Sequence, residues 1–404
     1  MNDWHHFKLY QIMKKIILII ASFLIIGLLA FGGYIYYQIN SMNKMARGAL
    51  ITKDFVKEIP FKRNDGHIVI EATINGQKGL FYFDSGAGNI LFKNRIKTDS
   101  FDKIGNLSST DASGKKMEMD LVTIPSLKIA NVEFQDLSFR LIDEFDFQCT
   151  DGIVGIIGYS AMRHANWQVD YENQIIRFSD KLNKLDVKGD KVALKINKFT
   201  FEPEVALQVN DTTPIYFTFD TGNAGGILAD KETFEQIKFQ NKFLFSGGKA
   251  TGLSGKNKKE FRDSTVYKLS DQLKLGTIKL DPTIIDYETP KALNLLGNKV
   301  LENYLVTISW SENAVWLKKI RTSKPSLFNF QYHKMGDKWL ITEIEKNLRS
   351  RFNVQPGDEI LEINGVTVNK QNRCTTFPEN TIFTIQTQSK KDIVNLKLVN
   401  LINK

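Results

Sequence analysis

The feature that most constrains this chain is a motif that occurs twice. Each copy is a short apolar run followed by aspartate, a hydroxyl residue and glycine: Phe81-Tyr82-Phe83-Asp84-Ser85-Gly86 and Phe217-Thr218-Phe219-Asp220-Thr221-Gly222. Such a run next to glycine is typical of a β-strand that ends in a tight turn. A single copy most often marks an ordinary turn. Two copies predict a duplicated fold in which both turns serve one purpose.

The two copies lie inside a longer repeat. About 30 residues after each aspartate comes a Ser-Gly-Lys turn between strand-like runs, which predicts a β-hairpin tip. An apolar pair followed by glycine comes next, and a tryptophan-containing strand and turn follow it in each half. The same landmarks recur in the same order at nearly the same spacing. This repetition predicts two units of one architecture.

The repeated half resembles a lobe of a retropepsin-like (clan AA) aspartic peptidase, over about residues 59–320. Retroviral members carry one lobe per chain and dimerise. Two tandem lobes, as in pepsin-like enzymes, imply that one chain completes its own site and is a monomeric catalytic unit. The first lobe would span residues 59–182 and the second residues 183–322.

The resemblance implies a role for each residue of the motifs. Asp84 and Asp220 would be the catalytic pair, and the hydroxyls of Ser85 and Thr221 would bond to the backbone of the opposite lobe. The residues assigned by position are Ser85, Gly86, Thr221 and Gly222 in the active-site loops, Ser113, Gly114, Ser254 and Gly255 in flaps over the substrate, and Gly158 and Gly297 behind the site.

Paired carboxyl groups have a chemical use. Two carboxylates held together do not both ionise readily, so they share one proton at intermediate pH. The ionised group takes a proton from water, and the protonated group donates to the carbonyl of a peptide or protein substrate. No metal or cofactor is needed, and the five histidines show no metal-ligand spacing. Asn223, where a small residue usually follows the glycine, makes the second lobe the more divergent.

Two other functions compete with an aspartic endopeptidase. The chain could be a peptide-binding or scaffold protein that keeps the fold without turnover, but the presence of both aspartates argues against this. A serine protease joined to a PDZ domain is the other alternative. It lacks support because no Gly-Asn-Ser-Gly-Gly-like nucleophile turn occurs with a suitably placed histidine and aspartate.

An uninterrupted apolar run, residues 16–37, precedes the repeat. Its length as a helix, about 33 Å, is enough to cross a bilayer. A cleaved signal peptide and a buried core helix are the alternatives. We expect an uncleaved anchor between a short tail, residues 1–15, and a polar stem, residues 38–58. Lys14 and Lys15 favour a cytoplasmic amino terminus, with the rest of the chain on the periplasmic side of a bacterial inner membrane.

The last segment, residues 326–404, has a different character. Gly357-Asp358-Glu359-Ile360-Leu361-Glu362-Ile363-Asn364-Gly365 resembles the core of a PDZ domain. The resemblance implies a small β/α domain that binds a peptide or protein ligand by adding it to a sheet edge, and that recruits or positions substrate. The usual carboxylate-binding loop is not evident before Trp339.

The net charge and the cysteines bear on the possible partners and on disulfide bonds. A net charge of +9 in a chain of 404 residues is spread in mixed-sign stretches, so we expect a solvated basic surface and no nucleic-acid partner. Cys149 and Cys374 fall in different predicted domains, which indicates free thiols. The predicted fold class is therefore mostly β: two tandem retropepsin-like β-barrel lobes that form one bilobal peptidase, a PDZ-like domain and one transmembrane helix.

Overall fold

The computed structural model describes residues 2–99, 101–110, 116–143, 152–198, 201–210, 214–247, 264–287, 293–335, 338–368, 377–388 and 391–403. The expected flap residues and both cysteines, Ser113, Gly114, Ser254, Gly255, Cys149 and Cys374, lie outside these ranges. The described part is mostly β, as the sequence predicts, with one long helix at the amino terminus. The chain divides into two compact units, Met1–Arg47 and Gly48–Lys404.

The first unit is a single helix, α1 (Asn2–Met45). Its described part, Met13–Met45, is long enough to cross a membrane and contains an 18-residue window with a mean hydropathy of 2.7. None of that window is buried inside the protein. Signal sequences meet the same test of length and composition. The predicted spanning run, residues 16–37, lies within this helix.

The first half of the second unit contains a closed, barrel-like sheet. Strand β8 pairs with both β4 and β9, so the order β9-β6-β10-β5-β4-β8 returns to β9. Most of its pairs are antiparallel, but β10 runs parallel to β5, and β6 runs parallel to β9. The strands are β1 (Ala49–Leu50), β3 (Lys62–Asn64), β4 (His67–Ile74), β5 (Gln77–Asp84), β6 (Ile90–Phe92), β7 (Asp102–Thr110), β8 (Lys116–Ile129), β9 (Val132–Ile142) and β10 (Ile153–Gly158), followed by helix α2 (Tyr159–Met162).

The second half repeats this pairing scheme. Strand β22 runs parallel to β15 as β10 does to β5, and β21 runs parallel to β16 as β9 does to β6. Strands β17 and β18 form a hairpin that corresponds to β7 and β8. The elements are β14 (Pro203–Val209), β15 (Ile215–Phe219), β16 (Ile227–Ala229), α3 (Lys231–Gln236), β17 (Asn241–Gly247), β18 (Ser264–Ser270), β19 (Leu273–Leu275), β20 (Ile278–Lys279), β21 (Thr283–Tyr287), β22 (Leu295–Leu296) and α4 (Asn298–Leu301).

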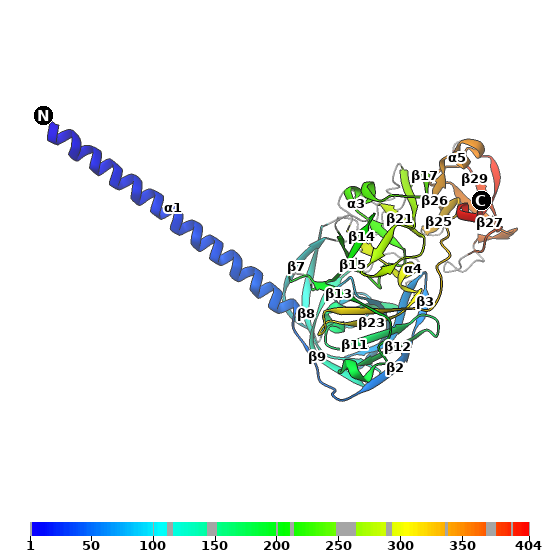
Figure 1. The fold of residues 1–404 in the computed structure, drawn as a ribbon, viewed down its shortest axis with the longest axis horizontal. Helices are drawn as coiled ribbons and strands as arrows, with labels where there is room; N and C mark the ends of the chain where they lie inside the picture. The colour runs from blue at the N-terminus through cyan, green and yellow to red at the C-terminus, as the bar shows by residue number, and fades with distance from the viewer. Residues whose placement is uncertain are drawn as a thin grey trace. The chain divides into compact units, whose positions relative to one another are not determined.

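One antiparallel sheet joins the halves, in the order β2-β12-β11-β23-β24-β13 (Figure 1). Its central pair, β11 and β23, brings equivalent strands of the two halves together. The bounds are β2 (Val56–Pro60), β11 (Asn166–Asp170), β12 (Ile175–Ser179), η1 (Leu182–Lys184), β13 (Asp190–Ile196), β23 (Tyr304–Ser309) and β24 (Ala314–Lys319). One buried apolar cluster includes side chains from both halves, such as Phe83, Trp167 and Phe219. The halves therefore share a core.

The expected polar stem, residues 38–58, is shorter in the structure. Helix α1 continues to Met45, while Ala49 and Leu50 pair with β9 and the residues from Val56 onward pair with β12. Leu50 and Phe55 are buried within the core, each only 6% exposed. Burial of these apolar side chains draws most of the expected stem into the folded unit.

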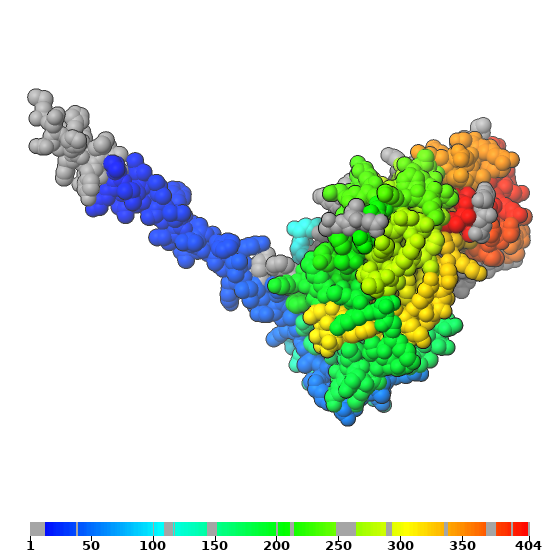
Figure 2. Space-filling model, viewed as in Figure 1, coloured from blue at the N-terminus to red at the C-terminus, as the bar shows by residue number. Residues whose placement is uncertain are grey.

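The C-terminal residues form a small sheet with its own core. Asn364 and Gly365 both have positive φ, 50° and 74°, as a tight Asn-Gly hairpin requires. The elements are β25 (Phe330–Met335), β26 (Lys338–Glu345), α5 (Lys346–Phe352), β27 (Glu359–Ile363), β28 (Val366–Thr367), β29 (Ile382–Gln386), β30 (Ile393–Lys397) and η3 (Leu401–Asn403). In the space-filling view these orange and red residues lie against the second half (Figure 2).

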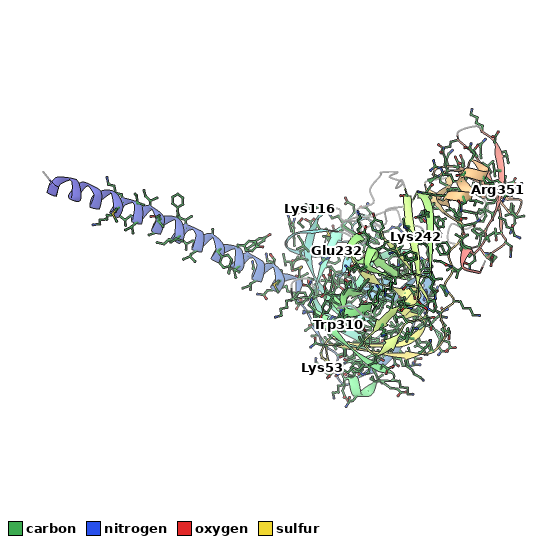
Figure 3. The ribbon with its side chains drawn as sticks, turned by 45° about the horizontal axis from the view of Figure 1, so that its top comes forward. Lys53, Lys116, Glu232, Lys242, Trp310 and Arg351 are labelled. Carbon is green, nitrogen blue, oxygen red and sulfur yellow. The ribbon has the colours of Figure 1, made fainter. Side chains whose placement is uncertain are left out.

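Strand β26 links this sheet to the second half. One edge of β26 pairs with β25, and the other pairs first with β27 and then with β17. Helix α5 also contacts β17, and Figure 3 labels one residue on each, Arg351 and Lys242. Both edges of β26 are therefore used.

Candidate active site

The two motif aspartates stand at equivalent places in the two halves. Asp84 is the last residue of β5, and Asp220 directly follows β15. The parallel neighbour of each strand ends beside it, with Gly158 paired to Asp84 in the first half and Leu296 to Phe219 in the second. Each aspartate therefore begins a turn at the carboxyl end of two parallel strands.

Four hydrogen bonds connect the two turns. The Ser85 hydroxyl donates to the carbonyl of Phe219 at 2.5 Å and accepts from the Thr221 N–H at 3.0 Å. The Thr221 hydroxyl likewise donates to the Phe83 carbonyl at 3.0 Å and accepts from the Ser85 N–H at 3.0 Å. Both side chains are buried, so each bond forms away from water. The turns are thus fixed to one another by a symmetric set of bonds.

Backbone N–H groups orient both carboxyl groups in the same way. Oδ1 of Asp84 accepts from Gly86 at 2.8 Å and from Ala87 at 3.0 Å. Oδ1 of Asp220 accepts from Gly222 at 2.8 Å and from Asn223 at 3.0 Å. In each turn this leaves the second oxygen, Oδ2, outside the backbone bonds.

The glycine of each motif faces the carboxyl group of the opposite motif. A Cβ on Gly86 would lie 2.5 Å from Cγ of Asp220, and one on Gly222 would lie 2.1 Å from Cγ of Asp84. Real side chains do not approach so closely, so only glycine fits at either place. The two carboxyl groups are also hydrogen-bonded to each other.

Burial raises the pKa of both carboxyl groups of this pair. Burial raises the pKa of Asp84, and the hydrogen bond from Asp220 partly reverses that effect. The pKa of Asp220 lies well above its ordinary value because burial, the charge of Asp84 and the bond to Asp84 all raise it. The pair therefore shares one proton, because two buried carboxyl groups in contact do not both ionise readily.

Gly158 and Gly297 lie directly behind the turns. A Cβ on Gly158 would lie 2.0 Å from the carbonyl oxygen of Ala87, and one on Gly297 would lie 2.6 Å from the carbonyl oxygen of Gly225. The N–H groups of the following residues donate to the turns, Tyr159 to Ala87 and Asn298 to Asn223, each at 2.8 Å. Both glycines thus allow a backbone to approach its turn closely.

The expected flaps are described only at their bases. Thr110 pairs with Lys116 at the end of one hairpin, and Ser246 pairs with Ser264 at the end of the other. The tip residues Ser113, Gly114, Ser254 and Gly255 lie in the segments that are not described. Their relation to a substrate stays a prediction.

Three residues near the turns were not found from the sequence. Nδ1 of His67 lies 2.8 Å from the carbonyl oxygen of Gly222. Asn298 donates to the Thr221 carbonyl at 2.7 Å and accepts from the Tyr171 hydroxyl at 2.8 Å. The strand register offers the one signal for His67, because continuing the antiparallel pairs Ile70–Phe81 and Val69–Tyr82 places it opposite Asp84. Among the described residues, no cluster of histidine, cysteine and carboxylate side chains could hold a metal ion.

Comparisons with known proteins identify one matching family, in the first half of the chain. A family model described as aspartyl protease matches residues 70–161, which include Asp84 and Gly158. The crystal structure of basic 7S globulin from soybean matches with a TM-score of 0.40 at 12% identity, over 65% of this chain and 94% of that chain. A likeness this distant carries no argument. No curated protein matches the chain. The family match supports an aspartic protease.

Proposed function

We propose that this chain is a membrane-anchored aspartic endopeptidase whose catalytic pair is Asp84 and Asp220. The observation that carries the proposal is the mutual placement of the two carboxyl groups. They are hydrogen-bonded to each other, and each lies against the glycine of the other motif. The aspartyl protease match to residues 70–161 supports the same chemistry for the first half.

The protonation of the pair suggests a role for each residue. Asp84 is the ionised group and acts as general base on a water molecule. Asp220 donates its proton to the carbonyl oxygen of the scissile peptide bond as the water oxygen bonds to the carbonyl carbon. The C–N bond then breaks: a hydroxyl group of the tetrahedral intermediate returns its proton to Asp220 as the carbonyl re-forms, and the proton held on Asp84 passes to the leaving nitrogen. No protein group is consumed, so the pair returns to its starting state.

We also propose roles for the other parts of the chain. We propose that the two halves are the lobes of one retropepsin-like peptidase and that the β7–β8 and β17–β18 hairpins carry its flaps. We also propose that α1 holds the chain in a membrane with the second unit outside the cytoplasm. The C-terminal sheet is proposed as PDZ-like, with a peptide or protein ligand. Since both edges of β26 are paired, such a ligand needs a different edge of that sheet.

Replacing each aspartate by asparagine tests the function. Asp84→Asn and Asp220→Asn keep shape but cannot pass a proton, so each should lower peptide cleavage by at least about 10³-fold. The double variant should be hardly slower than either single variant, because residues that act as a unit are not additive. Exposed Asp99, changed to asparagine, is the matched control. Cleavage of a fluorescence-quenched peptide library by the full chain in detergent gives the rates.

The outcome also decides between the proposal and its alternative. Wild-type cleavage by Asp220→Asn together with an inactive Asp84→Asn would contradict the two-carboxyl mechanism. A wild-type chain that binds peptides but never cleaves them would favour a scaffold protein that has kept the fold.

A further inference from the structure

His67 lies between the two halves, beside the proposed catalytic pair. It is the first residue of β4, and continuing the register of β4 with β5 two residues beyond the pair Val69–Tyr82 places it opposite Asp84 on the same face of the sheet. Its ring lies 5.1 Å from the ring of Tyr82, centroid to centroid. The preceding residue, Gly66, meets the second half directly, because a Cβ there would lie 2.8 Å from Cβ of Ala224.

The contact with Gly222 fixes the tautomer of the ring. A carbonyl oxygen can only accept, so Nδ1 of His67 must carry the proton that it donates across 2.8 Å. Burial lowers the pKa of His67, which favours the neutral ring, although the carboxylate of Asp65, the bond to the Gly222 carbonyl and the carboxylate of Asp84 oppose that effect. The remaining charged neighbour, Arg63, favours the neutral ring as well. His67 is thus a neutral hydrogen-bond donor.

The acceptor belongs to the peptide group that also binds Asp220. The carbonyl of Gly222 and the N–H of Asn223 are the two ends of one planar peptide. That N–H donates to Oδ1 of Asp220 at 3.0 Å. A bond to the carbonyl end restrains the peptide plane and polarises its N–H, which strengthens the bond at the other end. A continuous chain of contacts therefore runs from His67 through one peptide to the carboxyl group of Asp220.

We propose that His67 is a positioning residue that holds the Gly222–Asn223 peptide, and through it Asp220, in register with Asp84. This rests on the proposed function. During the reaction Asp220 gives up its proton, and a polarised N–H stabilises the carboxylate that results. The bond from His67 therefore stabilises the reacting state more than the resting state, so its loss should lower kcat.

The second half has a different residue at the position that corresponds to His67. The register of β14 with β15 pairs Glu204 with Thr218, and continuing it places Glu202 opposite Asp220, at the position that corresponds to His67. Glutamate has no N–H group that it could donate to a carbonyl as the imidazole does. The difference in residue type makes the environment of the two aspartates unequal, even though their own turns are nearly identical.

Two substitutions separate the hydrogen bond from the packing of the ring. His67→Phe keeps a ring beside Tyr82 but has no donor, whereas His67→Asn offers an N–H near the position of Nδ1. His164→Phe removes a half-buried imidazole elsewhere in the first half and serves as the control. The full chain is purified in detergent, and kcat and KM are measured with the fluorescence-quenched peptide that wild type cleaves best. We expect His67→Phe to lower kcat about 10- to 100-fold with little change in KM, because the loss of the bond displaces Asp220 and not the substrate. His67→Asn should recover most of that loss, and His164→Phe should keep the wild-type kcat.

A second readout does not depend on catalysis. Hydrogen exchange of the backbone over residues 219–226, followed by mass spectrometry, should be faster in His67→Phe than in wild type and near wild type in His67→Asn. If wild type cleaves no faster than Asp84→Asn, the proposed function fails, and this exchange result still tests His67. The inference is overturned if folded His67→Phe keeps wild-type kcat, or if its exchange is unchanged. A loss that His67→Asn does not reverse overturns it too, because the ring and not the donor would then be responsible.

Discussion

The hydroxyl of Tyr267 donates a 2.6 Å hydrogen bond to the carboxyl group of Glu343. Tyr267 lies on β18, in the hairpin of the second half, and Glu343 lies on β26 of the C-terminal sheet. The Thr265 hydroxyl donates to the same carboxyl group at 3.0 Å, and Glu343 is only 7% exposed. Together with the pairing of β17 and β26, these bonds make the C-terminal sheet part of the structure around the hairpin.

Tyr267→Phe should destabilise the chain. The substitution keeps the ring packed against Phe245 but removes one donor to a buried carboxyl group, which costs about 1–3 kcal/mol. Chemical denaturation of the second unit, followed by tryptophan fluorescence, measures the effect. Tyr216→Phe, at an exposed tyrosine, should leave the midpoint unchanged. Equal midpoints for the two variants would show that the Glu343 contact contributes nothing.

Gly222→Ala should abolish most activity in a folded protein. The added methyl group would lie 2.1 Å from Cγ of Asp84, so one of the two turns must move. A displacement on the order of 1 Å at a catalytic group can cost about 100-fold in rate. Gly225→Ala is the comparison in the same loop, because its nearest contact is the side-chain oxygen of Asn223 at 3.1 Å. Peptide cleavage by Gly222→Ala close to that of Gly225→Ala would contradict the packing described here.

Thr221→Val should lower stability, while Thr221→Ser should retain most of it. Valine keeps the shape of the side chain but leaves the Ser85 N–H and the Phe83 carbonyl without their buried partner, at about 1–3 kcal/mol for each group. The free energy of unfolding measures this. Because Ser85 belongs to the same set of bonds, the effects of Ser85→Ala and Thr221→Val should not add. Simple additivity in the double variant would show that the bonds act independently.

Asp220→Asn should change how stability depends on pH. The pKa of Asp220 in the folded protein lies well above the ordinary value of 3.8, so folding favours its protonated form. That contribution is complete below an unfolded-state pKa of about 4, and it is lost as pH rises through the folded-state pKa. Asparagine has no proton to lose. The Tm of Asp220→Asn relative to wild type should therefore increase as pH is raised, and a constant difference would contradict the assignment of the proton.

The secondary structure of several segments could be predicted from neighbouring residues alone. The apolar runs before Asp84 and Asp220 predicted strands, and the described structure is mostly β with an apolar amino-terminal helix, as expected. The aspartic protease chemistry was also predicted, and the family match supports it. These predictions were possible because strand, turn and glycine are contiguous in each motif, so their meaning depends on a few neighbouring residues.

Other features were decided only when distant segments met. His67 and Gly222 are 155 residues apart, and Tyr267 and Glu343 are 76 residues apart. No local pattern distinguishes His67 from any other histidine, because its role comes from a strand register and from the carbonyl of another half. In the same way, the sequence placed Leu50 and Phe55 in the stem, but both are buried in the core of the folded unit. The sequence by itself determined the two turns and their carboxyl groups, whereas long-range packing decided what surrounds them, since burial and hydrogen bonding depend on which segments meet in three dimensions.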